Sequence, residues 1–373
     1  MPSPLVHYRI LDLSRILAGP FCTQLLADFG AEVVKVEPAT GDPARTWGPP
    51  FEDGETGESA YFQSANRGKR SRMADLRDPA HLKRLHEILS QTDVLVENFL
   101  PDTAERLGLD WEEVHQRHPR LIVASIRGFA SDVEASRRAG YDFIIQAEAG
   151  WMAATGTPDG PPTKTPAALV DVLAALYAAN GIQAALLHRE RTGEALHIEV
   201  PLMEAALAGM VNVAASTLMT GEAPVRMGNA HPNIAPYQTF ACQGGEIALG
   251  VGSDRQFEML ALWLGLDLED EPQWRTNPGR VQDRDRLAAR LADIFCGLER
   301  DTVLTFCGDH AIPASPIRDL QDALFHQAGR LHRLIQPLLE VGSGRMVPTL
   351  ASPVLLNGQR ACASLPPPRW SKS

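Results

Sequence analysis

The sequence lacks most of the features that would direct a chain to a membrane, a metal or an oxidising compartment. Its 373 residues include only 5 cysteines, an odd number without a C-x-x-C spacing, which disfavours both a disulfide framework and a cysteine metal site. Asp12 and Arg15 interrupt what would be the apolar part of a signal peptide. Asp171, Asn180 and Gln183 interrupt the longest apolar run, which is short for a bilayer. We therefore expect a cytoplasmic protein without a metal or a membrane segment.

Positive charge is also scarce. The chain has 35 Lys and Arg against 46 Asp and Glu, a net charge of −11, which argues against general nucleic-acid binding. An anionic ligand must therefore rely on local basic clusters. No G-x-G-x-x-G motif follows the first expected strand, so a nicotinamide or flavin site of the usual kind is not supported. A hydrophobic content of 44% and this length indicate a globular protein of about two domains.

The order of periodic segments predicts an α/β fold. A strand at residues 8–13, a helix at 21–29 and a strand at 32–37 form a βαβ unit, for which a parallel sheet and a right-handed crossover are the rule. Further buried strands are expected at 93–97, 121–126 and 197–202, and a small-residue helix at 203–220. These segments assign 1–224 to a large Rossmann-like domain.

A smaller α+β domain is expected at 225–325. A linker rich in Gly and Pro at 221–236 precedes it. Two strands then flank Gln243-Gly244-Gly245, a strong hairpin signal, and helical patterns follow at 280–295 and 301–307. Residues 326–373 form a separate, extended C-terminal segment.

The stretch 162–202 carries the main chemical signal. Asp171 precedes a run from Val172 to Leu187 that is apolar nearly all round and is therefore expected to form a buried helix. One reading is that Asp171 is only the N-cap, since Asp readily accepts the free N–H groups of a first turn. The other is that this carboxylate stays ionised and attacks an acyl donor, with N–H groups at the start of the Val172 helix stabilising the oxyanion. The pattern alone leaves both open.

Two further segments have both a structural and a functional explanation. Four of the seven residues between Asn66 and Arg72 are basic; such a run is either a solvated face or a phosphate-binding cluster. Asn98 follows the buried strand 93–97. It is either a turn residue or a ligand contact at the carboxyl end of a parallel strand.

Together these segments resemble class III CoA-transferases (the CaiB/BaiF family), which include formyl-CoA, carnitine and bile-acid CoA-transferases. The likeness extends from about residue 10 to about residue 352. Its motifs are AGPFCTQLLADFGAEVVKVEP at 18–38, N-x-x-KRS at 66–71, R-x-G-Y-D at 138–142, and Asp171 ahead of a small-residue helix that ends in R-x-x-T-G at 189–193.

The resemblance implies that Asp171 is the catalytic nucleophile and coenzyme A, as an acyl-CoA, the substrate. It also implies a homodimer whose protomers are interlocked like chain links, with the active site between the large domain of one protomer and the small domain of its partner, and with 326–373 returning to the large domain. By position, it assigns coenzyme A contacts to Ile16, Ala18, Lys69, Arg70, Asp75, Arg77, Asn98, Phe99, Arg106, Arg138, Tyr141 and Asp142.

The acyl group is expected to be dicarboxylic. Family members that act on dicarboxylic acids resemble the chain at RTWGPPF (45–51) and GNAHPNIAPYQ (228–238), which assigns Arg45, His231 and Tyr237 to the substrate, although a lone His in a Pro-rich turn also has a structural explanation. Leu17 replaces a Gln of formyl-CoA transferases and disfavours a formyl or oxalate substrate. The expected function is CoA transfer from an acyl-CoA to a carboxylic acid, with a dicarboxylic acid as the expected acceptor, through an aspartyl mixed anhydride and an aspartyl-CoA thioester.

Two alternatives use the same fold. Sister racemases, which epimerise 2-methylacyl-CoA, carry a His base where this chain has Tyr141, and a phenol with a reference pKa of about 10 is a poor base near neutral pH. A non-catalytic coenzyme A-binding protein is the other alternative, although no substitution of the nucleophile favours it.

Overall fold

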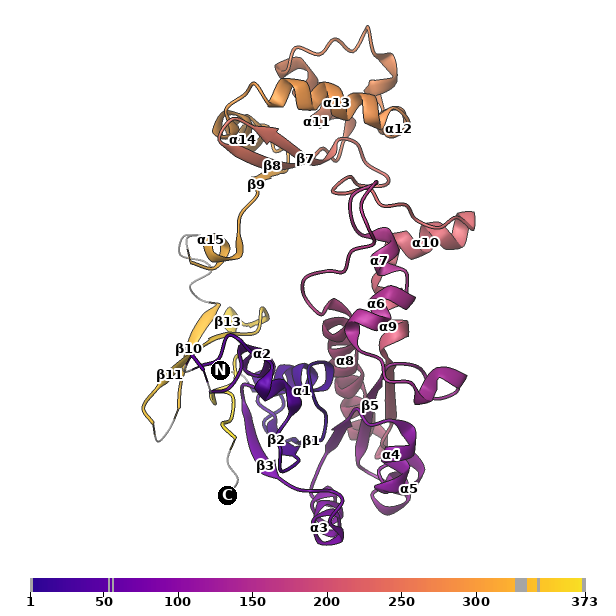
Figure 1. Ribbon diagram of the computed structural model, residues 1–373, viewed down its shortest axis with the longest axis vertical. Coiled ribbons are helices and arrows are strands. Elements are labelled where there is room, and N and C mark those ends of the chain that lie inside the picture. Colours follow the sequence, from indigo (N-terminus) through magenta and orange to yellow (C-terminus); the bar gives the residue numbers. More distant parts are fainter. Residues whose placement is uncertain (1–2, 53, 56, 326–333, 341–342, 371–373) are drawn as a thin grey trace. The chain divides into compact units, whose positions relative to one another are not determined.

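The computed structural model describes residues 3–52, 54–55, 57–325, 334–340 and 343–370 (Figure 1). The chain divides into two compact units. Unit 1 comprises Met1–Trp151, Lys164–Glu222 and Ala328–Ser373, and unit 2 comprises Met152–Thr163 and Ala223–Gln327. The expected domain boundaries lie within a few residues of these, except that Met152–Thr163 was expected in the large domain.

Unit 1 contains a six-stranded sheet in the order β3-β2-β1-β4-β5-β6, and every neighbouring pair is parallel. The strands are β1 (Arg9–Asp12), β2 (Glu32–Glu37), β3 (Lys69–Met73), β4 (Val94–Glu97), β5 (Ile122–Arg127) and β6 (His197–Pro201). This is the strand order of doubly wound Rossmann folds. The predicted parallel α/β fold is confirmed, but β3 was missed, because its basic sequence KRSRM shows no apolar alternation at the edge of the sheet.

Helices cover both faces of this sheet. Helices α1 (Ala18–Asp28) and α8 (Leu169–Thr192) pack together in the hydrophobic core on one face, which includes Ile10. The opposite face carries α3 (Pro79–Leu89), α4 (Pro101–Arg106) and α5 (Trp111–Arg117), whose core includes Leu11. Successive strand residues point to opposite faces, so Ile10 and Leu11 enter different cores.

Helix α8 differs from its prediction in length and burial. It spans 24 residues and ends at Gly193, whose φ of 85° is the left-handed conformation usual after a helix. Leu176, Tyr177 and Leu187 are each about half exposed, so only one side of the helix is buried. The helix is long and apolar enough to span a membrane, but half of its most apolar window is buried, and the core helix of a soluble protein meets the same criterion.

Unit 1 is completed by short helices and by the C-terminal segment. The helices are α2 (Ala60–Ser64), α6 (Asp142–Glu148), α7 (Trp151–Ala154, which crosses into unit 2), α9 (Leu202–Gly209) and α10 (Val211–Thr220). The single helix predicted at 203–220 is two helices that bend by 83°. In the C-terminal segment, β10 (Ile335–Leu339) pairs with β11 (Met346–Leu350), and β12 (Leu355–Leu356) with β13 (Gln359–Arg360). The segment is tied to the rest of unit 1 by two hydrogen bonds: the N–H of Gly68 donates to the carbonyl of Leu365, and the N–H of Ala363 donates to Oδ1 of Asp28.

Unit 2 has its own antiparallel sheet and hydrophobic core. The expected hairpin is formed by β7 (Tyr237–Cys242) and β8 (Gly245–Gly250), and β9 (Ala314–Pro316) pairs with β8. Its helices are α11 (Asp254–Trp263), α12 (Asn277–Gln282), α13 (Arg284–Phe295), α14 (Arg300–Asp309) and α15 (Leu320–Phe325). Phe240, Phe257 and Phe295 are among the buried residues of this core.

Candidate active site

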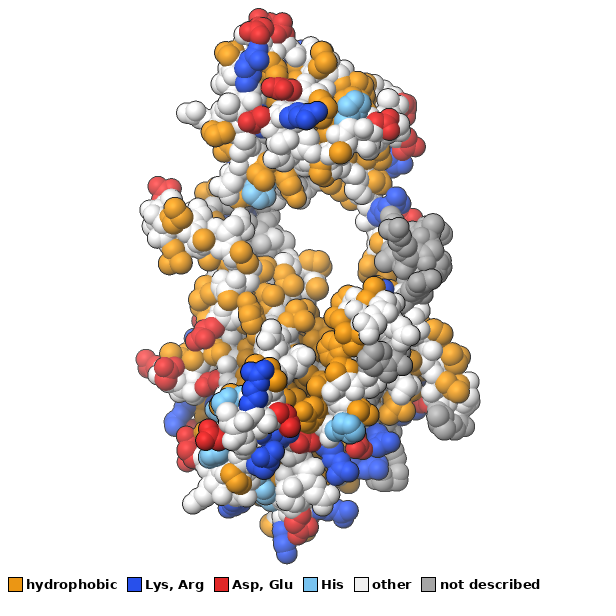
Figure 2. Space-filling model, turned by 180° about the vertical axis from the view of Figure 1, so that it is seen from behind, with side chains coloured by type: hydrophobic (Ala, Val, Ile, Leu, Met, Phe, Trp, Pro, Cys, Tyr) orange, Lys and Arg blue, Asp and Glu red, His pale blue; other side chains and the backbone are white. Residues whose placement is uncertain are grey.

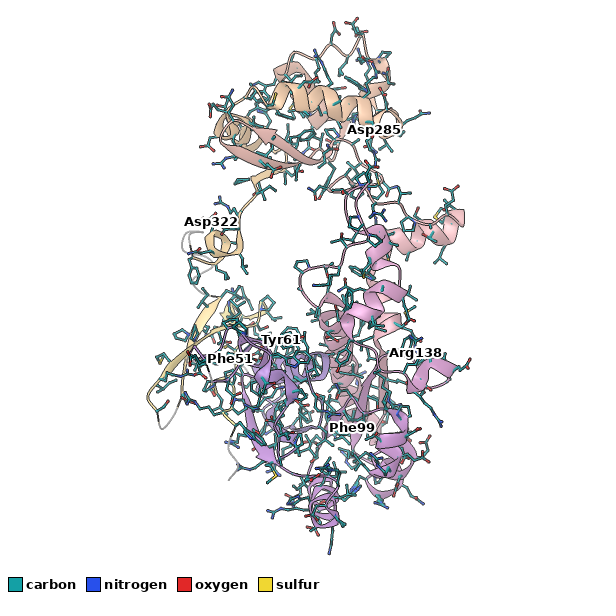
Figure 3. The ribbon with its side chains drawn as sticks, in the orientation of Figure 1. Phe51, Tyr61, Phe99, Arg138, Asp285 and Asp322 are labelled. Carbon is teal, nitrogen blue, oxygen red and sulfur yellow. The ribbon has the colours of Figure 1, made fainter. Side chains whose placement is uncertain are left out.

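The candidate active site is a cavity of about 340 Å³ in unit 1. Its walls include loop residues that follow β1 and β4, the two central strands between which the strand order reverses. Ligands of open α/β sheets bind at this position. The cavity brings together seven of the residues named from the sequence: Ile16, Ala18, Asn98, Phe99, Arg138, Tyr141 and Asp171. Phe99 and Arg138, both labelled in Figure 3, come from separate loops of unit 1.

Asp171 is the buried acid of this cavity. It lies in the first turn of α8 and is 8% exposed, and its carboxylate receives no hydrogen bond from the residues that the structure describes. Burial, with a smaller contribution from the Asp142 carboxylate, raises the pKa of Asp171 to about 7. Burial therefore works against the ionised form that we expect for this carboxylate from the sequence.

Asp142, and not Asp171, caps helix α8. Its Oδ1 accepts hydrogen bonds from the backbone N–H groups of Val170 (2.8 Å) and Asp171 (3.3 Å). Its Oδ2 accepts one from Nε2 of Gln146 (2.6 Å), and Oε1 of Gln146 accepts one from the N–H of Thr165 (3.0 Å). Helix α6 thus holds both the loop before α8 and the turn that carries Asp171. This corrects the N-cap reading of Asp171, whereas coenzyme A contact by Asp142 stays a prediction.

The backbone N–H groups at the start of α8 are not free, which corrects the expected oxyanion site. Those of Leu169 and Val172 donate to carbonyls of the same segment, and those of Val170 and Asp171 donate to Asp142. By contrast, the N–H groups of Leu17, Ala18 and Gly19 at the start of α1 have no acceptor among the described residues. Leu17 and Ala18 line the cavity, so the N-terminus of α1 is the better source of oxyanion donors.

The loop before α1 is held in a strained conformation. Ile16 has a φ of 74°, which is unfavourable for a β-branched residue. Its N–H donates to both carboxylate oxygens of Asp42 (3.2 Å each), and Asp42 forms a fully buried ion pair with Lys35 (2.9 Å). The Asn98 side chain accepts from the N–H of Arg15 and donates to its carbonyl. Asn98 therefore fixes this loop, a role that its position after β4 did not reveal.

A second cavity of about 790 Å³ shares walls with the first. Arg15, Phe99 and Thr103 line both cavities, and the second also contains Asp75, Arg77 and Arg106. Arg77 donates to the Asp75 carboxylate through Nε (2.9 Å) and Nη2 (2.8 Å). The sequence reasoning missed Arg15 as a site residue, although its place just after β1 was an available signal.

Lys69 lies in the interior, so its assignment to a phosphate of coenzyme A stays a prediction that these contacts do not support. It is 2% exposed, and its Nζ lies 3.0 Å from Oδ2 of Asp12, 2.8 Å from the Pro20 carbonyl and 2.8 Å from Oδ1 of Asn66. An ammonium group has three protons, so all of them are used. Arg70, the next residue, is exposed and pairs with Glu32 at 2.8 Å.

Arg45 is turned inward and is paired with two carboxylates, so its assignment to substrate stays a prediction without support from these contacts. It binds Glu37 through Nε and Nη2 (2.7 Å each), and its Nη1 lies 2.7 Å from Glu58. In unit 2, Nδ1 of His231 accepts from the N–H of Asn233 (3.0 Å), and its ring centroid lies 5.1 Å from that of Tyr237. Substrate contact by His231 and Tyr237 stays a prediction.

Metal binding has no evident location in the part of the chain that the structure describes. No group of three or more His, Cys, Asp or Glu residues there is arranged to hold a metal ion.

A parallel sheet in Rossmann order, with one buried carboxylate in the cavity at its reversal point, defines an α/β enzyme centred on an acidic side chain. Comparison with known proteins makes this more specific. The family model described as "CoA-transferase family III" matches residues 5–372. The chain belongs to this family and is a class III CoA-transferase, an enzyme that uses CoA thioesters.

Several of its relatives are named for dicarboxylic acids. The succinate–glutarate CoA-transferase of Agrobacterium fabrum is 38% identical over 359 residues, which cover 95% of this chain and 90% of that protein. The succinyl-CoA:glutarate CoA-transferase of Mus musculus is 40% identical over 331 residues, 88% of this chain and 75% of that protein. A crystal structure of a CAIB/BAIF family protein from Brucella suis superposes with a TM-score of 0.85 at 38% identity, covering 99% of this chain and 96% of that one. These relatives do not favour the racemase or the non-catalytic alternative.

Proposed function

We propose that this enzyme transfers CoA between a dicarboxylic acyl-CoA and a carboxylic acid, with Asp171 as a covalent nucleophile. The observation that carries the proposal is the carboxylate of Asp171, buried in the cavity without a hydrogen-bond donor among the described residues. A carboxylate that is poorly solvated is reactive toward a thioester, and an enclosed cavity protects an anhydride from hydrolysis. The activities for which two relatives are named, succinate–glutarate and succinyl-CoA:glutarate CoA transfer, support a succinyl or glutaryl group as the acyl group of the substrate.

The reaction balances without a further reactant. The Asp171 carboxylate attacks the thioester carbonyl, the C–S bond breaks, and an aspartyl mixed anhydride and a CoA thiolate form. The thiolate attacks the aspartyl carbonyl, which releases the first acid and leaves an aspartyl-CoA thioester. The acceptor carboxylate displaces the thiolate to form a second anhydride. The thiolate then attacks the carbonyl of the acceptor acyl group in this second anhydride, which yields the new acyl-CoA and restores the Asp171 carboxylate.

The two cavities suggest how an acyl-CoA would be held. The N–H groups of Leu17 and Ala18, which have no acceptor among the described residues and belong to residues that line the same cavity as Asp171, would stabilise the tetrahedral oxyanions. Arg77 and Arg106 line the second cavity, where guanidinium groups can bind the phosphates of the nucleotide. Arg15 and Phe99 lie between, since both cavities share them.

Intact-protein mass spectrometry after mixing with succinyl-CoA, with and without hydroxylamine, tests this mechanism. We expect an adduct on the wild type that hydroxylamine converts to a hydroxamate at Asp171, and no adduct on Asp171→Ala. A wild type that binds coenzyme A but forms no adduct with succinyl-CoA or with a panel of other acyl-CoAs would rule out the covalent mechanism.

We also propose that the enzyme is a homodimer. Hydrophobic side chains gather on the exposed surface of unit 1 (Figure 2), and the large ones on α8, α9 and α10 include Leu187, Leu207 and Leu218. Large exposed apolar side chains that gather on one surface are typical of protein interfaces. Light scattering should give about twice the chain mass of 40.6 kDa; a mass of one chain at micromolar concentration would contradict the dimer.

A further inference from the structure

We infer that Arg127 recognises the distal carboxylate of the dicarboxylic acyl group, an inference that rests on the function proposed above. Arg127 is the last residue of β5 and lines the same cavity as Asp171. Its side chain is only 10% exposed. The cavity therefore contains a buried cation from the carboxyl end of a strand as well as the buried acid from α8.

Most N–H donors of the Arg127 guanidinium make no hydrogen bond to the residues that the structure describes. Its only hydrogen bond to a described residue runs from Nη2 to Oε1 of Glu97, at a long 3.3 Å. Its Nε is buried and has no hydrogen-bond partner among the residues that the structure describes. Arg45, by contrast, makes three contacts of 2.7 Å with Glu37 and Glu58. A buried N–H group without an acceptor is unfavourable. A ligand carboxylate, which supplies two acceptor oxygens, would accept hydrogen bonds from the N–H donors of Arg127 that are unpaired.

Glu97 does not fully neutralise Arg127. The carboxylate of Glu97 is fully buried, and its Oε2 accepts from the N–H of Phe99 at 2.7 Å, so it also serves the loop after β4. Burial raises the pKa of Glu97 even though Arg127 favours its ionised form. A second carboxylate can therefore pair with Arg127 while Glu97 keeps its contact with Phe99.

The other two arginines of the cavity are placed differently. Arg138 is half exposed and pairs with Glu148 at 2.8 Å. Arg15 is exposed, and it belongs to both cavities, a position suited to the coenzyme A portion that all thioesters share. Of the three arginines, Arg127 has the least exposed side chain, as expected for a group that binds the acyl end of the substrate.

The test compares succinyl-CoA with butyryl-CoA, whose acyl groups both have four carbons and differ at the distal end, a carboxylate against a methyl group. For each thioester, kcat/KM is measured with the same saturating acceptor for wild type, Arg127→Gln and Arg15→Gln. We expect Arg127→Gln to reduce the preference for succinyl-CoA over butyryl-CoA by about 10- to 100-fold, since a hydrogen bond to a charged group is lost. Arg15→Gln should lower both values by similar factors and leave the preference unchanged.

Arg127→Gln also leaves Glu97 without its cation, so the double variant Glu97→Gln/Arg127→Gln, which removes both buried charges, is measured in parallel. The same loss of preference is expected. An unchanged preference in whichever variant folds would overturn the inference and leave Arg127 as the counter-ion of Glu97. A wild type that transfers CoA from neither thioester would overturn the proposed function itself, together with the inference that rests on it.

Discussion

Replacing Asp171 with Asn is expected to lower the rate of CoA transfer by at least about 10⁴-fold, the scale on which enzymes lose activity when a nucleophile is removed. An amide oxygen cannot form the anhydride. The exchange is nearly isosteric, and the Asp171 side chain makes no hydrogen bond to a described residue that would be lost. Steady-state transfer from succinyl-CoA, with Asp132→Asn as an exposed control, measures the effect. A variant that keeps more than a hundredth of the wild-type rate would exclude Asp171 as nucleophile.

The same Asn variant should be more stable than the wild type at alkaline pH. Asp171 has a pKa of about 7 in the folded state against 3.8 in the unfolded chain. Well below pH 4 Asp171 is protonated in both the folded and the unfolded state, so its ionisation does not change the free energy of unfolding. Between pH 4 and 7 the unfolded chain loses its proton first, so stability falls as pH rises, by about 4 kcal/mol in all, and stays low above pH 7.

Urea unfolding at pH 4.5 and pH 8 tests this prediction. The Asn side chain titrates at neither pH, so its advantage over the wild type should grow by a few kcal/mol between the two. An advantage that does not change with pH would show that the carboxylate is not destabilised by burial.

Replacing Lys69 with Met is expected to destabilise unit 1 by about 3–5 kcal/mol, because it leaves the buried Asp12 carboxylate without its cation. Asp12 lies at the end of β1, and Lys69 holds it together with the Pro20 carbonyl of α1. The adjacent Arg70→Met is the matched control. Its ion pair with Glu32 is about half exposed, so it should cost less than about 1 kcal/mol.

Urea unfolding and the KM for acyl-CoA separate the two roles of Lys69. We expect a lower midpoint of unfolding for Lys69→Met. A variant with wild-type stability and a strongly raised KM for acyl-CoA would instead support the assignment of Lys69 to a phosphate of coenzyme A.

The elements that could be predicted from the sequence are those whose signal is local. Strand β2 and helix α1 follow from apolar periodicity, and the β7–β8 hairpin follows from Gly244 and Gly245, which adopt positive φ angles of 84° and 132°. The importance of Asp171 came from a motif that is contiguous in the chain. Each of these signals lies within one element or between neighbouring ones, where side-chain spacing and turn chemistry act directly.

The partners of the charged residues became evident only from the three-dimensional fold. Lys69 meets Asp12 from 57 positions away, Asp142 reaches the N–H of Asp171 across 29 positions, and Glu97 meets Arg127 across 30. A basic side chain in a sequence pattern looks the same whether it binds a phosphate or a buried carboxylate. The choice depends on which strands become neighbours in the sheet, and therefore on long-range packing that no local period encodes.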